Sequence, residues 1–181
     1  MTSYFKTIDL SSFWDDSDYY KENCTEPVPT PELIQSIEEE LGYKLPTSYM
    51  ELMKSRNGGA PKNTAFPTTE ATSWAEDHIA ISSISSIGRD KMYSLCGELG
   101  SQFMIDEWGY PAIGIVICGC PSAGHDVVML DYRNCGSQGE PEVIHVDQED
   151  DYKITFLATN FEEFILGLKN DGEFALIEGI L

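Results

Sequence analysis

The sequence predicts an α+β fold in which a curved antiparallel β-sheet of about five or six strands is flanked by helices. Two helical patterns come first along the chain, a series of short strand patterns follows, and a helical pattern closes the series. Helices and strands that are segregated in this way are typical of α+β folds. The connections between the strand patterns are too short for parallel crossovers, so neighbouring strands should pair antiparallel.

The chain of 181 residues fits one domain, for which we expect three parts. Residues 1–29 are interpreted as an N-terminal arm whose aromatic residues dock on the main body, with Trp14 and Tyr19 set among aspartates. Residues 30–170 form the core. Residues 171–181 form a C-terminal extension that is too apolar for a free tail, so we expect it to pack on the domain.

Two helices are predicted after the arm, over residues 31–41 and 47–56. Thr30 is a suitable N-cap, Pro31 suits the first helical position, and Gly42 should end the first helix. The run Asn57-Gly58-Gly59 should end the second helix, because these residues tolerate positive φ. Residues 60–76 contain prolines and many threonines and are predicted to form a long loop.

The strands and the later helices are predicted from their periodicities. Alternating or continuous apolar runs predict strands over residues 78–81, 112–118, 126–132, 142–147 and 152–157. A short helix is expected around residues 96–106. The capping-box sequence Thr159-Asn160-Phe161-Glu162 and apolar residues at helical spacing predict a final helix over 160–169.

The charge of the chain restricts its partners. Thirty-one acidic residues against eleven lysines and arginines give a formal net charge of −20, and between Lys91 and Lys153 the only basic residue of these types is Arg133. Such a field repels nucleic acid and anionic membranes and attracts a basic protein. Solubility is the alternative explanation of this charge. No apolar run approaches the ~18 residues of a membrane span, and we see no secretory signal, so a cytoplasmic protein is expected.

No catalytic or cofactor motif stands out, and we expect no cofactor. Cys118, Cys120, His125 and Cys135 have side chains that can bind zinc, and the alternative is that the cysteines are buried core thiols. The C-x-C spacing is poor for zinc, so we expect these cysteines to bind no metal and to form no disulfide. Several carboxylates could serve acid–base chemistry or a hard cation, but solvent-facing strand acids or a binding rim are the preferred interpretation.

An ordered set of short motifs resembles the SUKH superfamily, the Smi/Knr-type domains, over roughly residues 14–168. The motifs are Leu41-Gly42, Leu45-Pro46-Thr47-Ser48-Tyr49, Asn57-Gly58-Gly59, Glu107-Trp108-Gly109-Tyr110-Pro111, Gly124-His125-Asp126, Leu130-Asp131-Tyr132, Gly139-Glu140-Pro141 and Phe161-Glu162-Glu163-Phe164. The resemblance implies a curved antiparallel sheet flanked by helices. In bacteria it implies an immunity protein that binds and neutralises a polymorphic or contact-dependent toxin, and in fungi a regulator of cell-wall synthesis.

The resemblance carries over no catalytic residue, so we expect a non-enzymatic protein that binds a basic partner, most simply a toxin domain. The carboxylates would pair with the partner's lysines and arginines, and the two aromatic residues would anchor the dry centre of the interface. The expected contact residues are Glu107, Trp108, Tyr110, Asp126, Asp131, Glu140, Glu142 and Asp147. The alternatives are a regulatory adaptor, or a hydrolase or metal enzyme whose dispersed site would include His145 or Cys120.

Overall fold

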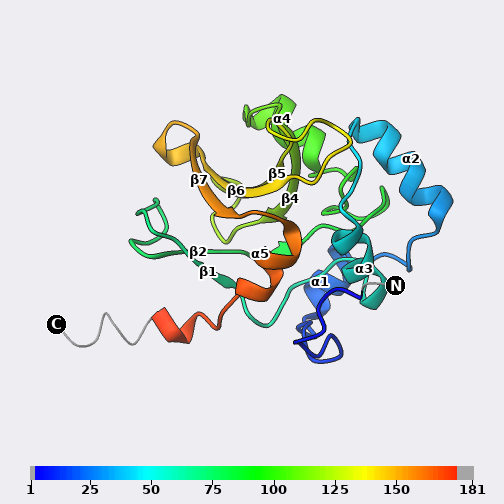
Figure 1. Cartoon of the computed structure of the whole chain (residues 1–181), viewed down its shortest axis with the longest axis horizontal. Coiled ribbons are helices and arrows are strands. Elements are labelled where there is room, and N and C mark those ends of the chain that lie inside the picture. Colours follow the sequence, from blue (N-terminus) through cyan, green and yellow to red (C-terminus); the bar gives the residue numbers. More distant parts are fainter. Residues whose placement is uncertain (1–2, 175–181) are drawn as a thin grey trace.

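The computed structural model describes residues 3–174 and has an α+β architecture built around one antiparallel sheet (Figure 1). The strands are β1 (Ala65–Pro67), β2 (His78–Ala80), β3 (Ser83–Ile84), β4 (Gly114–Gly119), β5 (Asp126–Asp131), β6 (Glu142–Asp147) and β7 (Lys153–Ala158). The helices are α1 (Asp18–Asn23), α2 (Pro31–Leu41), α3 (Thr47–Ser55), α4 (Ser101–Trp108) and α5 (Phe161–Gly167), with a 3-10 turn η1 at Gln148–Asp150.

The main sheet is a meander of five antiparallel strands in the order β3-β4-β5-β6-β7, while β1 and β2 pair separately. The predicted antiparallel pairing of the strands from residue 112 onward is therefore confirmed. The predicted loop over residues 60–76 was wrong in part, because β1 lies within it and pairs with β2. Residues 175–181, most of the expected extension, lie outside the described residues.

Both faces of the main sheet are covered by apolar packing. The larger core contains residues of α2, α3, α5 and the inward-facing side chains of the strands, among them Tyr49, Val128 and Phe161. The smaller cluster lies on the opposite face, where Met104 of α4 packs with Val116, Met129 and other strand residues. Figure 1 shows α4 on one side of the curved sheet and α5 with β1 and β2 on the other. The strands are therefore apolar on both faces.

Local sequence signals explain where the helices begin and end. The Thr30 side chain accepts a hydrogen bond from Leu33 N at 3.1 Å, and α2 ends where Gly42 adopts a φ of 81°. The cap of α5 is Asn160, one residue later than the Thr159 of the predicted capping box, and its Oδ1 accepts from Glu163 N at 2.9 Å.

The N-terminal arm is part of the fold. Phe5 and Trp14 are buried in the larger core, and Trp14 Nε1 donates to Ser55 Oγ at 3.0 Å. The backbone N–H of Phe5 donates to the Glu162 carboxylate at 3.3 Å, across 157 residues of chain. The expected docking of the arm's aromatic residues is thus confirmed for Trp14, whereas Tyr19 on α1 is exposed.

Candidate partner-binding surface

The structure divides the eight predicted contact residues between two ends of the sheet. Asp126 and Asp147 are register partners at one end of β5 and β6, and Asp131 and Glu142 are register partners at the other. Five residue steps separate the ends, about 17 Å along an extended strand. Glu107, Trp108 and Tyr110 belong to the Asp126 end, because Tyr110 Oη donates to Gly124 O at 2.5 Å. The eight residues therefore do not form one patch.

Three of the predicted carboxylates are not available to a partner. Asp126, Asp131 and Asp147 each retain only 1–2% of their exposure, so the prediction of solvent-facing strand acids was wrong for them. The reason is that both faces of the sheet are covered at these three positions, so their side chains do not reach solvent. Ser73 in the loop after β1 covers Asp147, to which its backbone N–H and Oγ both donate at 2.8 Å.

Asp131 is neutralised within its own strand end. Arg133 Nη2 donates to Asp131 Oδ2 at 2.7 Å, and Arg133 Nε donates to Oδ1 at 3.0 Å. Burial alone would raise the pKa of Asp131, but the hydrogen bonds from Arg133 outweigh it and hold the pKa below its ordinary value. The charge of Asp131 is thus balanced by Arg133 of the same chain.

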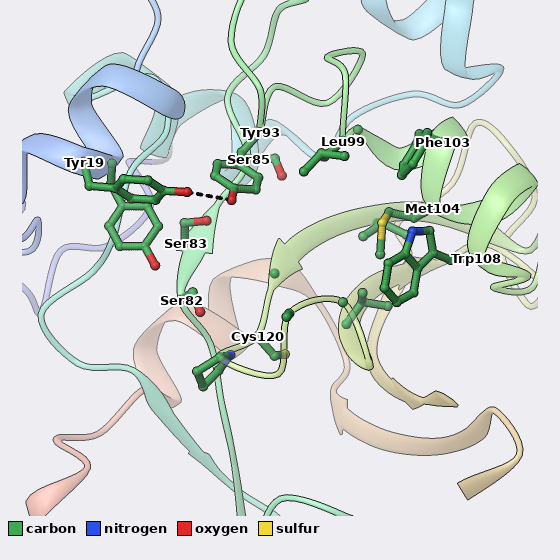
Figure 2. A pocket seen from close by; sticks show the side chains of 18 residues that line it. Tyr19, Ser82, Ser83, Ser85, Tyr93, Leu99, Phe103, Met104, Trp108 and Cys120 are labelled. Atoms are coloured by element: carbon green, nitrogen blue, oxygen red, sulfur yellow. Dashed lines mark hydrogen bonds between the residues drawn. The ribbon is translucent and has the colours of Figure 1, made fainter. Parts of the chain in front are cut away.

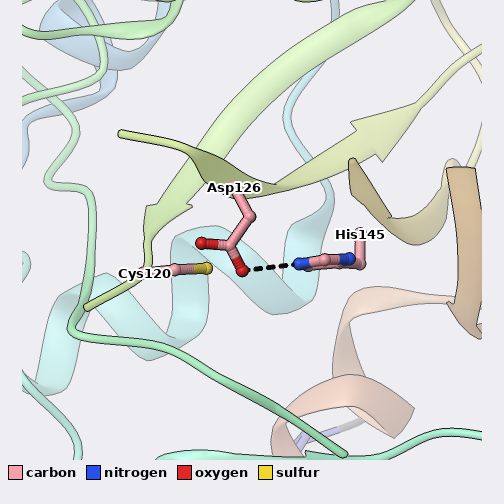
Figure 3. A group of neighbouring side chains, drawn as sticks. All are labelled: Cys120, Asp126 and His145. Atoms are coloured by element: carbon pink, nitrogen blue, oxygen red, sulfur yellow. Dashed lines mark hydrogen bonds and ion pairs between the residues drawn. The ribbon is translucent and has the colours of Figure 1, made fainter. Parts of the chain in front are cut away.

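Asp126 lies between Cys120 and His145 in a buried cluster (Figure 3). His145 Nε2 is 2.7 Å from Asp126 Oδ2, and the Cys120 thiol points at the same carboxylate. The ligand atoms of the three residues lie within 4.8 Å of one another, and the donor types are ones that zinc accepts. The spacing of these three residues along the chain does not predict the cluster, because Asp126 and His145 are brought together by the pairing of β5 with β6.

The geometry of this cluster does not provide a nucleophilic thiolate. In a cysteine–histidine pair the imidazole contacts the sulfur and takes its proton, whereas here Asp126 separates the two. Burial and the neighbouring Asp126 carboxylate raise the pKa of Cys120 well above its ordinary value, so the thiol stays protonated. His125, the histidine of the possible zinc site with Cys118, Cys120 and Cys135, is exposed. Its Nδ1 lies 2.7 Å from Glu149 Oε1 instead.

Tyr110 was also wrong as an accessible anchor. It is 2% exposed, its hydroxyl is bonded to Gly124 O, and its ring packs edge-to-face on Tyr152 at 5.5 Å. Trp108 is half-buried, and its ring meets His125 edge-on at 5.6 Å. Of the two predicted aromatic contact residues, Trp108 is therefore the one that remains accessible.

The exposed acids at the Trp108 end form what we call the acidic end: Asp106, Glu107, Glu149, Asp150 and Asp151. The two parts of this group are joined through Trp108, whose carbonyl oxygen accepts from Tyr152 Oη at 2.6 Å and from Gln148 Nε2 at 3.4 Å. The sequence shows the acidic turn after residue 147, but only the tertiary contact with α4 places it beside Glu107.

A cleft of about 430 Å³ adjoins the acidic end, between α1 and α4. Figure 2 shows Phe103, Met104 and Trp108 across this cleft from Tyr19 and Tyr93. The residues that line it, all within the described part of the chain, include no acid, lysine, arginine or histidine. The Tyr19 and Tyr93 hydroxyls are 3.0 Å apart, and this hydrogen bond together with burial raises the pKa of Tyr93 to about 12. The cleft is therefore neutral, and five of its eighteen lining residues are aromatic.

A comparison with known families identifies the family of this chain. The family model SUKH_6, described as SMI1-KNR4 cell-wall, matches residues 31–165. The chain belongs to this SUKH family. No curated protein matches the chain.

The SUKH match begins at α2 and ends within α5, so the arm lies outside it. Tyr19 and Tyr20 of α1 nevertheless line the cleft, which means that this SUKH chain completes its aromatic cleft with residues from beyond the matched segment. SUKH domains are generally protein-binding and non-catalytic. Within residues 3–174, no helix has the length and apolarity that crossing a membrane requires.

Proposed function

We propose that this SUKH chain is an immunity protein that neutralises a basic toxin domain by binding it at the acidic end. The observation that carries the proposal is the acidic end itself, five exposed carboxylates grouped around Trp108. One of them, Glu149, lies 2.7 Å from His125 Nδ1. A surface with excess negative charge and an aromatic residue at its centre suits a partner rich in lysine and arginine.

The cleft beside Trp108 gives this surface a place for an anchor side chain. Its neutral lining, which includes five aromatic residues, suits an apolar or aromatic residue of the partner, which would be desolvated there while basic residues contact Glu107 and the acidic turn. Glu140 and Glu142, at the far end of the sheet, are left outside the proposed interface. Asp126, Asp147 and Tyr110 are buried beneath the acidic end, and Asp131 is buried at the far end.

The test compares charge reversal at the two ends of the sheet. The probe for this test is the protein encoded by the gene directly upstream, purified and also co-expressed with this chain. We expect Glu149→Lys/Asp150→Lys to slow association about tenfold at low salt and to abolish protection of the host cell, because charge steering is removed. The matched control is Glu140→Lys/Glu142→Lys, which makes the same change in net charge and should alter the association rate by less than about twofold.

A melting curve of each variant shows whether it is folded. Equal losses in both variants would mean that only net charge matters, and the acidic end would be rejected as the site. The second candidate function is a regulatory adaptor, because the matched family is described as SMI1-KNR4 cell-wall. An adaptor would bind a host protein through the same surface, but its co-expression would give no protection from a toxin.

A further inference from the structure

Strand β7 (Lys153–Ala158) is the outer strand of the main sheet and is paired on one side only. Its register partner on that side is β6. Among residues 3–174, no backbone hydrogen bond joins the other side of β7 to another segment. A six-residue edge with unpaired N–H and C=O groups is a template for another strand, and proteins usually cover or blunt such an edge.

The accessible face of β7 is apolar. Ile154 is 36% exposed and Phe156 is 54% exposed, which makes Phe156 one of the most exposed large hydrophobic side chains among the described residues. Their register partners are Val146 and Ile144, which are buried in the smaller cluster under α4. In Figure 1, α4 lies over β4 and β5 and β7 lies at the margin of the sheet. The apolar face of the sheet thus extends beyond the part that α4 covers, as far as the edge strand β7.

The acidic residues at both ends of β7 indicate which kind of strand could pair with its free edge. Glu149, Asp150 and Asp151 are exposed just before the strand, and Glu163 is exposed just after it. The one cation on β7, Lys153, is directed at Ala71 O at 3.1 Å and Glu70 at 3.5 Å. A second copy of this chain would bring the same acids to the edge and would be repelled, whereas a basic strand would be attracted.

We infer that β7 is a docking edge that accepts a β-strand of the basic partner and extends the main sheet by one strand. This inference rests on the proposed function. The added strand would bond to the free backbone groups of β7, and its alternate apolar side chains would cover Ile154 and Phe156. Lysines or arginines flanking that strand would meet Glu149, Asp150 and Asp151, so the edge and the acidic end form one continuous interface.

The experiment uses the full chain and the upstream-encoded protein as the probe. Phe156→Lys removes the apolar contact and places a cation at the edge, a change that natural sheets use to prevent strand addition. The matched control is Val28→Lys, because Val28 is 61% exposed and lies shortly before α2, a helix on the opposite side of the molecule from β7 in Figure 1. We expect Phe156→Lys to weaken binding at least about tenfold and Val28→Lys to change it less than about twofold.

Hydrogen exchange of the β7 amides gives a readout of backbone pairing. The outward-facing amides of residues 153–158 should exchange quickly in the free chain and at least about tenfold more slowly in the complex. If charge reversal at the acidic end weakens binding while Phe156→Lys and the β7 amides show no effect, the docking edge is rejected and the proposed function stands. If the wild-type chain does not bind the probe, both are rejected.

Sedimentation of the free chain tests the competing occupant. A dimer that becomes a monomer on Phe156→Lys substitution would show that a second copy occupies the edge, and the inference would be overturned. A monomer in both variants, together with slowed β7 exchange in the complex, is the result that supports it.

Discussion

The two ends of the main sheet differ in how the charges of their acidic residues are balanced. At the Asp131 end, the buried carboxylate is held by Arg133 and its charge is balanced within the molecule. At the Asp126 end, the buried carboxylate is paired with His145, while five exposed acids around Trp108 are left with little compensating charge. The comparison shows that net charge alone does not locate a binding surface. Burial and internal partners decide which carboxylates remain available to another protein.

The largest effect should follow from breaking the buried pair at the Asp126 end. His145→Ala leaves the Asp126 carboxylate buried without its imidazole partner, and removing one member of a buried pair typically costs about 3–5 kcal/mol of unfolding free energy. Urea unfolding at pH 7 measures the loss. The double variant His145→Leu/Asp126→Leu should recover much of it, since no unpaired charge remains. A loss below about 1 kcal/mol in the single variant would contradict the assigned pairing.

A smaller effect is expected at the other end. Arg133→Ala removes the charged hydrogen bonds to Asp131, but the Arg133 side chain is half exposed, so solvent can partly replace them. We expect a loss of about 1–2 kcal/mol in the same urea experiment. Arg133→Lys should restore only part of the stability, because a lysine cannot reproduce the paired contacts of a guanidinium group. Full recovery with lysine would indicate that charge alone matters there.

The Asp131 end should also show a dependence on pH. The pKa of Asp131 is lower in the folded chain than in the unfolded one, so its contribution to stability is present above the unfolded pKa of about 4 and is lost as the pH falls through the folded pKa. The stability difference between the wild type and Asp131→Asn should therefore be constant from pH 5 to pH 7 and shrink below pH 4. A difference that grows on acidification would contradict the sign of the shift.

The smallest effect on stability is expected at the exposed acids. Glu149→Lys/Asp150→Lys should change the unfolding free energy by less than about 0.5 kcal/mol, because both side chains are solvated in the 3-10 turn. The same variant should have the largest effect on partner association. Unfolding curves and association rates measured on one preparation would separate the two roles.

Elements with strong local signals could be predicted from the sequence. Helix α2 follows from its Thr30 cap and from Gly42 at its end, and its bounds agree with the prediction. The strand over residues 142–147 also has the predicted bounds. Strand β1 was missed because three residues carry too little periodicity, and its pairing with β2 depends on tertiary contacts.

The candidate site was harder to predict than the fold. Asp126, Asp131 and Asp147 stand in strands, and a sequence does not show whether a second layer covers the outer face of a sheet. Here α4 covers one face of the sheet, and the loop that contains Ser73 covers Asp147 on the other face. Trp108 and Glu107 were found from composition and the SUKH resemblance, but the cleft was not, since Tyr19 and Tyr93 meet only in the folded chain.

The contact between Phe5 and Glu162 has a consequence for how the protein folds during synthesis. Phe5 is made before Glu162, the acceptor of its N–H, which follows 157 residues later. Contacts of such sequence separation slow folding, because a long loop must close before they form. The docking of Phe5 therefore cannot be completed before Glu162 has been made, whereas Trp14 can already pack on Ser55 of α3.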